Sequence, residues 1–285
     1  MPSLLHVVSY DLLCPLATKT LPSGAPCRER AGVACRQRGC VPWLGVARLS
    51  VQRWLTDLSV FARVIGVSRW VADRLHAEGV RVDEVVPNGI PTRPRRPPLG
   101  ERPSIGFAGR LVKKKGVDVL LAATAELLRR VPSVRLVVVG DGPERALLEA
   151  LAASLRIDHA VEFVGHVDRA TAEQILDVCW LQAVPSVWEE PFGLVAAEAM
   201  MRGTAVVASG SGGLTEQVVD GETGYLVPPG DASALAHALE RVVVDRDLAE
   251  RLGDAGRRRA LAELTEDRYV DRILAIYARM QTERP

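Results

Sequence analysis

The sequence predicts an α/β protein with parallel sheets, in which a complete domain is joined to part of a second one. From residue 104 onward, short runs of β-branched residues alternate with longer amphipathic stretches, which is the pattern of successive strand-helix-strand units. Before that region, a cluster of prolines and arginines at residues 91–103 can continue neither a helix nor a central strand. We therefore expect a polar linker on the outside of the protein, between two unequal parts.

The elements expected after the linker form one regular series. Six strands are predicted, at residues 104–108, 134–139, 161–164, 180–184, 204–208 and 225–227. Eight helices are predicted, at residues 117–130, 144–155, 169–178, 194–201, 214–219, 232–244, 248–263 and 267–280. Before the linker we expect only a strand at residues 4–8, a helix near residues 49–58 and a strand-helix unit at about residues 64–76. The chain is accordingly divided into residues 1–95, residues 96–265 and a final helix within residues 266–285.

Composition indicates a globular protein with a core and excludes some classes of partner. Of the 285 residues, 48% are hydrophobic and 25% are charged, as in ordinary globular domains. A formal net charge of +1 gives no overall field that would attract nucleic acid. Because no stretch reaches the roughly 20 apolar residues needed to span a bilayer, we expect a cytoplasmic protein. Scattered arginines such as Arg28 and Arg36 leave two alternatives open, a peripheral contact with the inner membrane face and a plain solvated surface.

Four of the five cysteines lie close together near the start of the chain. Cys14, Cys27, Cys35 and Cys40 are separated by 12, 7 and 4 residues, whereas Cys179 stands alone. These spacings lack the paired Cys-x-x-Cys knuckles of a structural zinc site. They favour plain structural thiols in a loop, with a metal-binding or redox-labile cluster as the alternative.

A first candidate site follows the strand at residues 104–108. Arg110 comes directly after this strand, and Lys115 closes a run of three lysines just before a helix. Ligands of open parallel sheets bind at the carboxyl ends of the strands, and a helix N-terminus there favours an anion. Arg110 offers a planar fork of donors and Lys115 a compact charge, which suits a diphosphate better than a solvated basic loop.

A second candidate site combines two carboxylates with the start of a helix. Glu190 lies in the loop before the helix and Glu198 lies about a turn and a half inside it, so they address different parts of one elongated ligand. Between them, the backbone N–H groups near Gly193 and Leu194 are free to bind sugar hydroxyls or a phosphate. The rest of this helix is apolar nearly all round, so we expect Glu198 to be buried and to need a hydrogen-bond partner.

Three turns that contain glycine should share the same edge of the sheet. They lie at residues 140–143, at residues 165–167 and at residues 209–213, the last followed by Glu216. Because glycine has no side chain, such turns can approach a base or a ribose closely. His166 in the second turn is interpreted as a loop residue rather than a general base.

Together these segments resemble glycosyltransferase family 4, the retaining enzymes that use nucleotide sugars and have two Rossmann-like domains of the GT-B type. The matching segments occur in the family's order, at residues 68–75, 85–90, 109–111 with 115–116, 139–143, 163–165, 190–198 and 212–213 with Gly224. The Glu-x7-Glu segment with Pro191, Phe192 and Gly193 inside it is the most specific of them. The resemblance implies a complete C-terminal Rossmann-like domain that binds the nucleotide sugar and a partial N-terminal one.

The resemblance also implies a role for each site residue. Arg110 and Lys115 would hold the donor diphosphate, and Glu190 would contact the transferred sugar. The donor-binding set would further include Gly109, Gly165, Val167, Phe192, Gly193, Leu194 and Glu198, with Glu198 on the ribose hydroxyls and the turn at Gly165 and Val167 against the base. Arg110, Lys115 and the helix N-terminus would stabilise the negative charge that the departing nucleoside diphosphate gains.

No metal or other cofactor is implied by the family. The partners implied are a UDP- or GDP-sugar donor and a glycan or lipid-linked acceptor, with no nucleic acid. By the same resemblance, the helix at residues 267–280 should return to the N-terminal domain.

Two departures from the family pattern leave a second function open. The family's chains begin well before the strand at residues 4–8, which would make this chain an N-terminally truncated member. Val8 and Ser9 stand where the family has a His-Asp pair whose histidine contacts the donor sugar, although His6 should point to the same face of a strand as Val8. The alternative to a transferase is a catalytically silent module that binds nucleotide sugars and needs a partner to supply the missing half.

Overall fold

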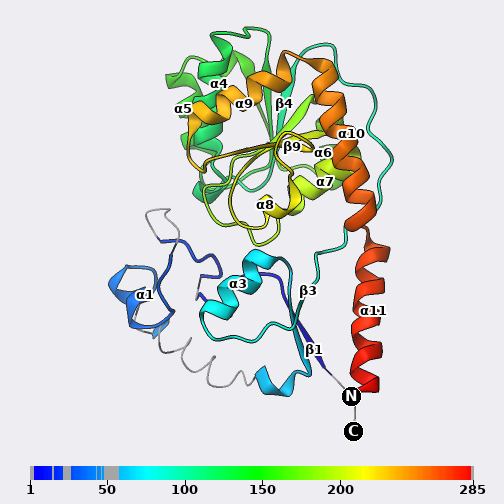
Figure 1. Ribbon diagram of the computed structural model, residues 1–285. Helices are drawn as coiled ribbons and strands as arrows, with labels where there is room; N and C mark the ends of the chain where they lie inside the picture. The colour runs from blue at the N-terminus through cyan, green and yellow to red at the C-terminus, as the bar shows by residue number, and fades with distance from the viewer. Residues whose placement is uncertain are drawn as a thin grey trace.

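The computed structural model describes residues 3–14, 16–21, 27–42, 44–45, 47 and 58–283, and these form two lobes (Figure 1). The larger lobe, coloured green to orange, holds a six-stranded sheet, and the smaller lobe, coloured blue and cyan, holds a three-stranded sheet. The last helix, α11 (Glu266–Thr282), leaves the larger lobe and runs along the smaller one. Apart from Leu58, the helix expected near residues 49–58 lies outside the described residues.

The larger lobe is built on six parallel strands. They are β4 (Ser104–Ala108), β5 (Arg135–Val139), β6 (Val161–Gly165), β7 (Leu181–Val184), β8 (Ala205–Ser209) and β9 (Gly224–Val227). Their order in the sheet is β6-β5-β4-β7-β8-β9, so the chain builds one half outward from β4 and then returns to build the other half from β7. This doubly wound, Rossmann-like arrangement confirms the predicted fold class. Its topological switch point lies between β4 and β7, where such sheets bind ligands.

Helices cover both faces of this sheet. One face packs mainly against α4 (Val117–Leu128), α5 (Arg145–Ser154) and α9 (Ala232–Val243), and the other against α7 (Leu194–Arg202) and α10 (Arg246–Glu263). In β8, Val207 belongs to the first of these two cores and the adjacent Val206 to the second. Because both faces are covered, the central strands are mostly apolar rather than alternating, with Gln182 of β7 as a buried polar exception. The shorter helices α6 (Arg169–Asp177) and α8 (Leu214–Gln217) complete the lobe.

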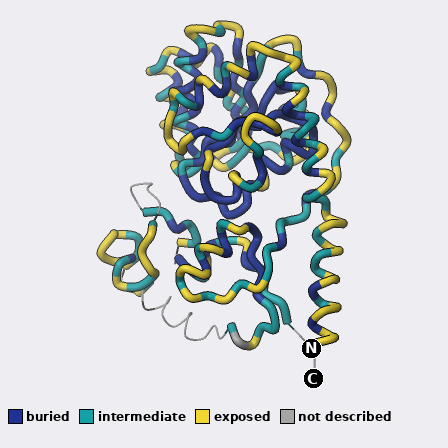
Figure 2. The backbone as a smooth tube through the Cα atoms, viewed as in Figure 1, coloured by how far each residue is buried: buried dark blue, intermediate teal, exposed yellow. Residues whose placement is uncertain are grey.

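The smaller lobe has three parallel strands in the order β1-β2-β3. These are β1 (Leu4–Val7), β2 (Arg63–Gly66) and β3 (Glu84–Val85), and helix α3 (Arg69–Ala77) follows β2. Ile65 packs against Ile276 and Met280 of α11, whereas the adjacent Val64 packs with the buried face of α3. Figure 2 shows the corresponding alternation along α11, where buried segments are separated by exposed ones. The smaller lobe therefore acquires one of its two layers from the far end of the chain.

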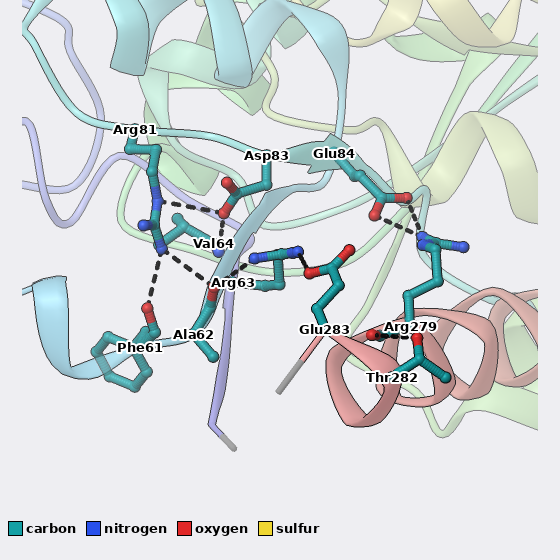
Figure 3. Close-up of polar contacts among 10 residues, drawn as sticks. All are labelled: Phe61, Ala62, Arg63, Val64, Arg81, Asp83, Glu84, Arg279, Thr282 and Glu283. Carbon is teal, nitrogen blue, oxygen red and sulfur yellow. Dashed lines mark hydrogen bonds and ion pairs between the residues drawn. The ribbon is translucent and has the colours of Figure 1, made fainter. Parts of the chain in front are cut away.

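Polar contacts at the edge of the smaller lobe also hold α11 (Figure 3). Arg279 donates to both carboxylate oxygens of Glu84, at 2.5 and 2.7 Å. Glu283, just beyond α11, pairs with Arg63 of β2. Because these pairs are partly or largely exposed, each adds little free energy, and the apolar contacts of α11 account for most of its packing.

Every strand and helix expected after the linker is present, and their ends differ from the predicted ones by two residues or fewer. Neither β3, the short helix α1 (Val33–Gln37) nor the 3-10 helix η2 (Lys113–Lys115) was predicted from the sequence. These elements are too short to show a periodic pattern.

The prediction that the linker lies outside the protein is wrong for its central residues. The side chain of Arg96 is fully buried, and its Nε donates to the carbonyl oxygen of Gly203 at 3.0 Å while its Nη2 lies 2.9 Å from Glu250. Leu99 belongs to the core of the larger lobe. A buried guanidinium is tolerated here because a carbonyl and a carboxylate partner it.

Candidate functional site

The predicted phosphate-binding residues lie at the switch point of the six-stranded sheet. Arg110 follows β4, Lys115 ends η2, and Glu190 belongs to the loop between β7 and α7. A pocket of about 370 Å³ opens between this loop and the residues that follow β1 in the smaller lobe. Its lining includes Val8, Ser9, Asn88, Lys115, Ser186, Trp188, Glu190, Phe192, Gly193 and Leu194. We call this space the cleft pocket.

Lys115 and Glu190 form an ion pair at the floor of the cleft pocket. The Lys115 Nζ lies 2.5 Å from the Glu190 Oε1, and Ser186 donates its hydroxyl to the same oxygen at 2.7 Å. Glu190 is only 7% exposed, so its charge depends on these two partners. Two predicted site residues that lie 75 positions apart in the sequence are thus in direct contact.

A glycine lets the lysine turn approach the strand β7. Gly116 follows η2 with a φ of 68°, in the left-handed region, and a Cβ at this position would lie 2.0 Å from the carbonyl oxygen of Pro185. No other residue type fits so close to that carbonyl. Gly116 therefore fixes the distance between Lys115 and the loop that carries Glu190.

Two further cations near the cleft pocket have no carboxylate partner among the described residues. Arg110 is exposed and forms no ion pair there. The Lys114 Nζ lies 3.8 Å from the ring centroid of Trp188. Burial lowers the pKa of Lys114, and the charges of Lys115 and Arg110 lower it further against the opposite effect of Glu190. A dianionic ligand would relieve this excess of positive charge.

The start of α7 supplies the backbone part of the site. Gly193 precedes α7 with a φ of 93°, and Phe192, Gly193 and Leu194 all line the cleft pocket. The first N–H groups of a helix have no partner within it and favour hydroxyls or anions. The turn after β8 supports this segment, because the Gly213 backbone N–H donates to the Glu190 carbonyl at 2.6 Å.

The glycines of the other predicted turns meet at the same edge of the sheet. Gly109 donates to the carbonyl of Val139, and Gly140 donates to the carbonyl of Gly165 at 2.9 Å. Gly109, Gly165 and Val167 nevertheless lie outside the lining of the cleft pocket. The structure thus gathers these turns beside the pocket, on the side of β5 and β6.

The expectation that Glu198 is buried is wrong. Its side chain is 31% exposed, and its Oε1 accepts a hydrogen bond from the Arg169 Nη2 at 3.0 Å. Glu198 lies on the part of α7 that faces the start of α6, where the apolar cover of the helix ends. It therefore has a charged partner at the surface, and it does not line the cleft pocket.

The expectation that His6 shares a face with Val8 is also wrong. The His6 ring stacks on Tyr269 of α11, with 5.8 Å between centroids, and its Nε2 lies 3.1 Å from the Val86 carbonyl oxygen. Burial lowers the pKa of His6, against the opposite effect of that carbonyl. Because β1 ends at Val7, the alternation of a strand does not extend to Val8. Val8 and Ser9, not His6, line the cleft pocket.

Helix α3 of the smaller lobe holds the loop that carries Glu190, which the sequence did not indicate. The Arg74 Nε donates to Glu189 at 3.1 Å, and the Ser68 hydroxyl donates to the Pro191 carbonyl at 2.6 Å. Glu216 of α8 accepts hydrogen bonds from the first two N–H groups of α3 at 2.9 and 2.8 Å, where Figure 1 shows α8 directly above α3. Ser68 also caps α3 by accepting a hydrogen bond from the Val71 N–H at 3.1 Å, and no pattern in the sequence indicates its partner across the lobes.

Aromatic residues complete this contact between the lobes. Tyr10 packs edge-on against Trp188, with 6.4 Å between ring centroids. The Tyr10 hydroxyl and the Trp188 indole nitrogen are buried without a hydrogen-bond partner among the described residues. Burial, together with the charge of Glu189, raises the pKa of Tyr10. The only signal in the sequence was the richness of this loop in aromatic and acidic residues.

A larger pocket, of about 690 Å³, lies on the other side of Phe192. It is lined by residues of α8 and α10 together with Arg69 and Arg272. The lysine turn and Glu190 do not line it. We place the candidate site in the smaller cleft pocket because Lys115, Glu190 and the segment 192–194 converge there, whereas Arg110 lines neither pocket.

The cysteines give no sign of a metal centre within the described residues. All five are free thiols, and no three Cys, His, Asp or Glu side chains in the described ranges are arranged to hold an ion. Cys14, Cys27, Cys35 and Cys40 line one cavity of about 10 Å³. Among the described helices, none is both long and apolar enough to cross a membrane.

Comparison with known proteins gives a family model and several relatives. The model described as "Glycosyl transferases group 1" matches residues 91–259. A glycogen synthase of Mycobacterium tuberculosis is 36% identical over 194 residues, which cover 66% of this chain and 46% of that protein. A GDP-mannose-dependent alpha-(1-6)-phosphatidylinositol monomannoside mannosyltransferase of Mycolicibacterium smegmatis is 34% identical over 284 residues, covering 90% of this chain and 72% of that protein.

Among solved structures, a sucrose-phosphate synthase of Thermosynechococcus elongatus superposes with a TM-score of 0.73. It is 29% identical, and the match covers 89% of this chain and 67% of that one. Because the match extends over both lobes, it supports the expected two-lobed GT-B architecture. The chain spans about half the length of the glycogen synthase that it matches.

Proposed function

The chain belongs to the group 1 glycosyl transferases, and on that premise we propose that it is a retaining transferase. It would move a sugar from a UDP- or GDP-sugar to a glycan or lipid-linked acceptor of the cell envelope. The observation that carries the proposal is the Lys115–Glu190 pair at the switch point, beside two cations that lack a carboxylate partner among the described residues.

The cations account for the first chemical requirement, which is to stabilise the leaving group. Breaking the glycosidic bond places negative charge on the departing diphosphate. Arg110 and Lys115 would hold this diphosphate, with the N-terminus of α7 nearby, and such preorganised donors lower the barrier without reorganising during the reaction. Because these groups supply positive charge, we propose that no metal cofactor is needed.

The carboxylates would hold the rest of the donor. When a diphosphate engages Lys115, Glu190 loses an ion-pair partner and becomes free to accept hydrogen bonds from hydroxyls of the transferred sugar. The backbone N–H groups of residues 192–194 would donate hydrogen bonds to the same sugar. Glu198 would accept hydrogen bonds from the ribose hydroxyls. Arg169 would fix the orientation of this carboxylate through its hydrogen bond of 3.0 Å. The turn at Gly165 and Val167, beside Gly109, would then lie against the base.

The choice of donors and acceptors to test follows from the relatives. The Mycolicibacterium smegmatis protein is named as GDP-mannose-dependent and as acting on a phosphatidylinositol monomannoside. We therefore include GDP-mannose and a lipid-linked acceptor among the proposed substrates of this chain. Contact with the inner membrane face from the cytoplasm is proposed on the same ground.

A second candidate function is a silent module that binds nucleotide sugars and works with a second polypeptide. The observation that favours it is that Val8 and Ser9 line the cleft pocket opposite Glu190, so no titratable group of β1 reaches the sugar side. Such a module would bind the donor but leave it intact.

Binding and hydrolysis of a panel of UDP- and GDP-sugars would separate the two candidates. The purified chain is compared with Arg110→Ala and Glu198→Ala, and with Arg130→Ala on the outer surface as a matched control. Saturable binding that falls about tenfold in the two site variants only, with slow release of nucleoside diphosphate, supports the transferase. Binding without release supports the silent module, and no binding of any donor contradicts both.

A further inference from the structure

The larger of the two pockets lies between the lobes, and the proposed function does not use it. It measures about 690 Å³, and its lining comes from the larger lobe, from the smaller lobe and from α11. Phe192 lines both this pocket and the cleft pocket. We call it the arginine pocket, because Arg69, Arg259 and Arg272 reach it from α3, α10 and α11. A volume of several hundred Å³ is typical of a site for a small molecule.

The carboxylates that line the arginine pocket already have partners. Glu216 accepts hydrogen bonds from the first two N–H groups of α3, at 2.9 and 2.8 Å. Asp220 accepts a hydrogen bond from the Leu226 N–H at 2.9 Å, and Glu263 pairs with Arg259 at 3.3 Å. Each carboxylate is held by these contacts, and in the described part of the chain none of them forms an ion pair with the two remaining arginines.

Three polar side chains of the pocket lack a partner. Arg69 and Arg272 form neither an ion pair nor a side-chain hydrogen bond with any described residue. Gln217 is only 4% exposed, yet its side-chain amide has no hydrogen-bond partner within the described ranges. Because buried polar groups are nearly always hydrogen-bonded, this amide requires a partner inside the pocket. Two guanidinium groups beside it favour a partner that carries negative charge.

We infer that the arginine pocket is a second binding site, for a small molecule that carries a phosphate group. Arg69 would hold the phosphate from the smaller lobe and Arg272 from α11, while the Gln217 amide would donate to a third oxygen. A phosphate offers three terminal oxygens to donors that approach from several sides, whereas a carboxylate offers two in one plane. The pocket is larger than a phosphate, so the rest of the ligand would lie against the apolar part of the lining, which includes Phe192.

The inference goes beyond the proposed transfer of a sugar, because Lys115 and Glu190 do not line the arginine pocket. The test therefore keeps the cleft pocket occupied. Inorganic phosphate and glycerol 3-phosphate are titrated, at constant ionic strength, into the chain saturated with UDP, and binding is followed by the rise in Tm. The same titration of Lys115→Met without UDP shows whether the signal is independent of the cleft pocket. We expect saturable binding in both experiments and no effect of glycerol.

Variants show whether the binding belongs to the arginine pocket. Arg69→Ala and Arg272→Ala should each weaken binding of the phosphate compounds about tenfold, and Gln217→Met, which keeps the size of the side chain, about threefold. Arg268→Ala removes an exposed arginine one turn away on α11 that does not line the pocket, and it should change binding less than about twofold. Because Arg69 and Arg272 have no partner among the described residues, replacing them should leave the fold intact, which circular dichroism checks.

The outcomes separate this inference from the proposed function. If neither phosphate compound binds saturably, or if Arg268→Ala weakens binding as much as Arg272→Ala, the inference is wrong, and intact UDP binding then leaves the proposed function standing. Loss of UDP binding with phosphate binding retained overturns the proposed function alone.

A further arm identifies the source of the phosphate. Vesicles of phosphatidylcholine with and without phosphatidylinositol are sedimented with the wild type and with Arg272→Ala. Binding to the phosphatidylinositol vesicles that needs Arg272, and with which inorganic phosphate competes, assigns the phosphate to a lipid headgroup. Binding of glycerol 3-phosphate without binding to either vesicle assigns it to a free molecule. Both results support the site.

Discussion

The two lobes differ in where their covering layers come from in the sequence. In the larger lobe, the helices on both faces alternate with the strands along the chain. In the smaller lobe, one face of the β1-β2-β3 sheet is covered by α11, which is the last helix of the protein. The larger lobe therefore has contacts that a local pattern can predict, whereas the smaller lobe depends on contacts over nearly the whole chain. The cleft pocket lies where the two meet.

The largest expected effect tests the close packing of the larger lobe at the site. Gly116→Ala places a Cβ 2.0 Å from the Pro185 carbonyl oxygen at a φ of 68°, whereas Gly221→Ala, at a φ of 76°, meets no atom within 4 Å. Urea unfolding should show that Gly116→Ala lowers the free energy of unfolding by about 3 kcal/mol and Gly221→Ala by about 1 kcal/mol. Equal losses would contradict the idea that the lysine turn is held against Pro185.

A smaller effect tests the contact between the lobes. Arg74→Ala leaves Glu189 almost fully buried, and the cation that then remains near it in the described part of the chain is the exposed Arg28, at 3.8 Å. We expect the free energy of unfolding to fall by about 2 kcal/mol, less than for a fully buried pair because Arg74 is partly exposed. Arg81→Ala removes an exposed arginine 3.3 Å from Asp83 in the same lobe and should lower it by about 0.5 kcal/mol. If the two variants unfold alike, α3 does not hold the loop that carries Glu190.

The contact between α11 and the smaller lobe should depend on pH through His6. Burial keeps the folded-state pKa of His6 below the unfolded value of 6.5, so protons bind more tightly to the unfolded chain. The contribution of neutral His6 is present above pH 6.5 and is lost as the pH falls toward the folded-state pKa. Thermal unfolding at pH 7.5 and pH 5.5 should show a larger drop in Tm for the wild type than for His6→Gln. Identical drops would mean that His6 is solvated in the folded protein.

Thiol labelling compares the two lobes directly, and of these experiments it should disturb the fold least. Burial raises the pKa of Cys179 in the larger lobe to about 11, whereas Cys27 in the smaller lobe is partly exposed. Iodoacetamide at pH 8 should modify Cys27 in the folded protein and leave Cys179 unmodified until urea is added, as judged by mass spectrometry. Labelling of Cys179 as fast as Cys27 would show that the core of the larger lobe opens readily.

The sequence predicted the larger lobe well because its strands and helices follow one another with clear periods. It failed where a side chain depends on a partner far away in the chain. Arg96 is buried because Gly203 and Glu250 provide it with hydrogen-bond acceptors. Glu198 stays partly exposed and has a charged partner in Arg169, at the start of α6. Neither partner shows in the local pattern of the linker or of the helix.

The candidate site shows the same limit. The pairing of Lys115 with Glu190 could be anticipated, because both follow strands whose carboxyl ends share one edge. The contributions of Arg74 and Tyr10 could not, since they come from the smaller lobe and reach the site only through tertiary contacts. His6 was misplaced because the strand that carries it ends one residue before Val8.

We expect the cleft pocket to bind the diphosphate of a nucleotide through Lys115. Calorimetric titration with UDP and GDP tests it most directly, with Lys115→Met compared with Lys113→Met, which removes an exposed lysine of the same turn that pairs with Asp118. Circular dichroism confirms that each variant is folded. We expect Lys115→Met to weaken binding by about tenfold or more and Lys113→Met to change it less than about twofold. Equal weakening by both variants, or unchanged binding by Lys115→Met, would show that Lys115 does not hold the diphosphate.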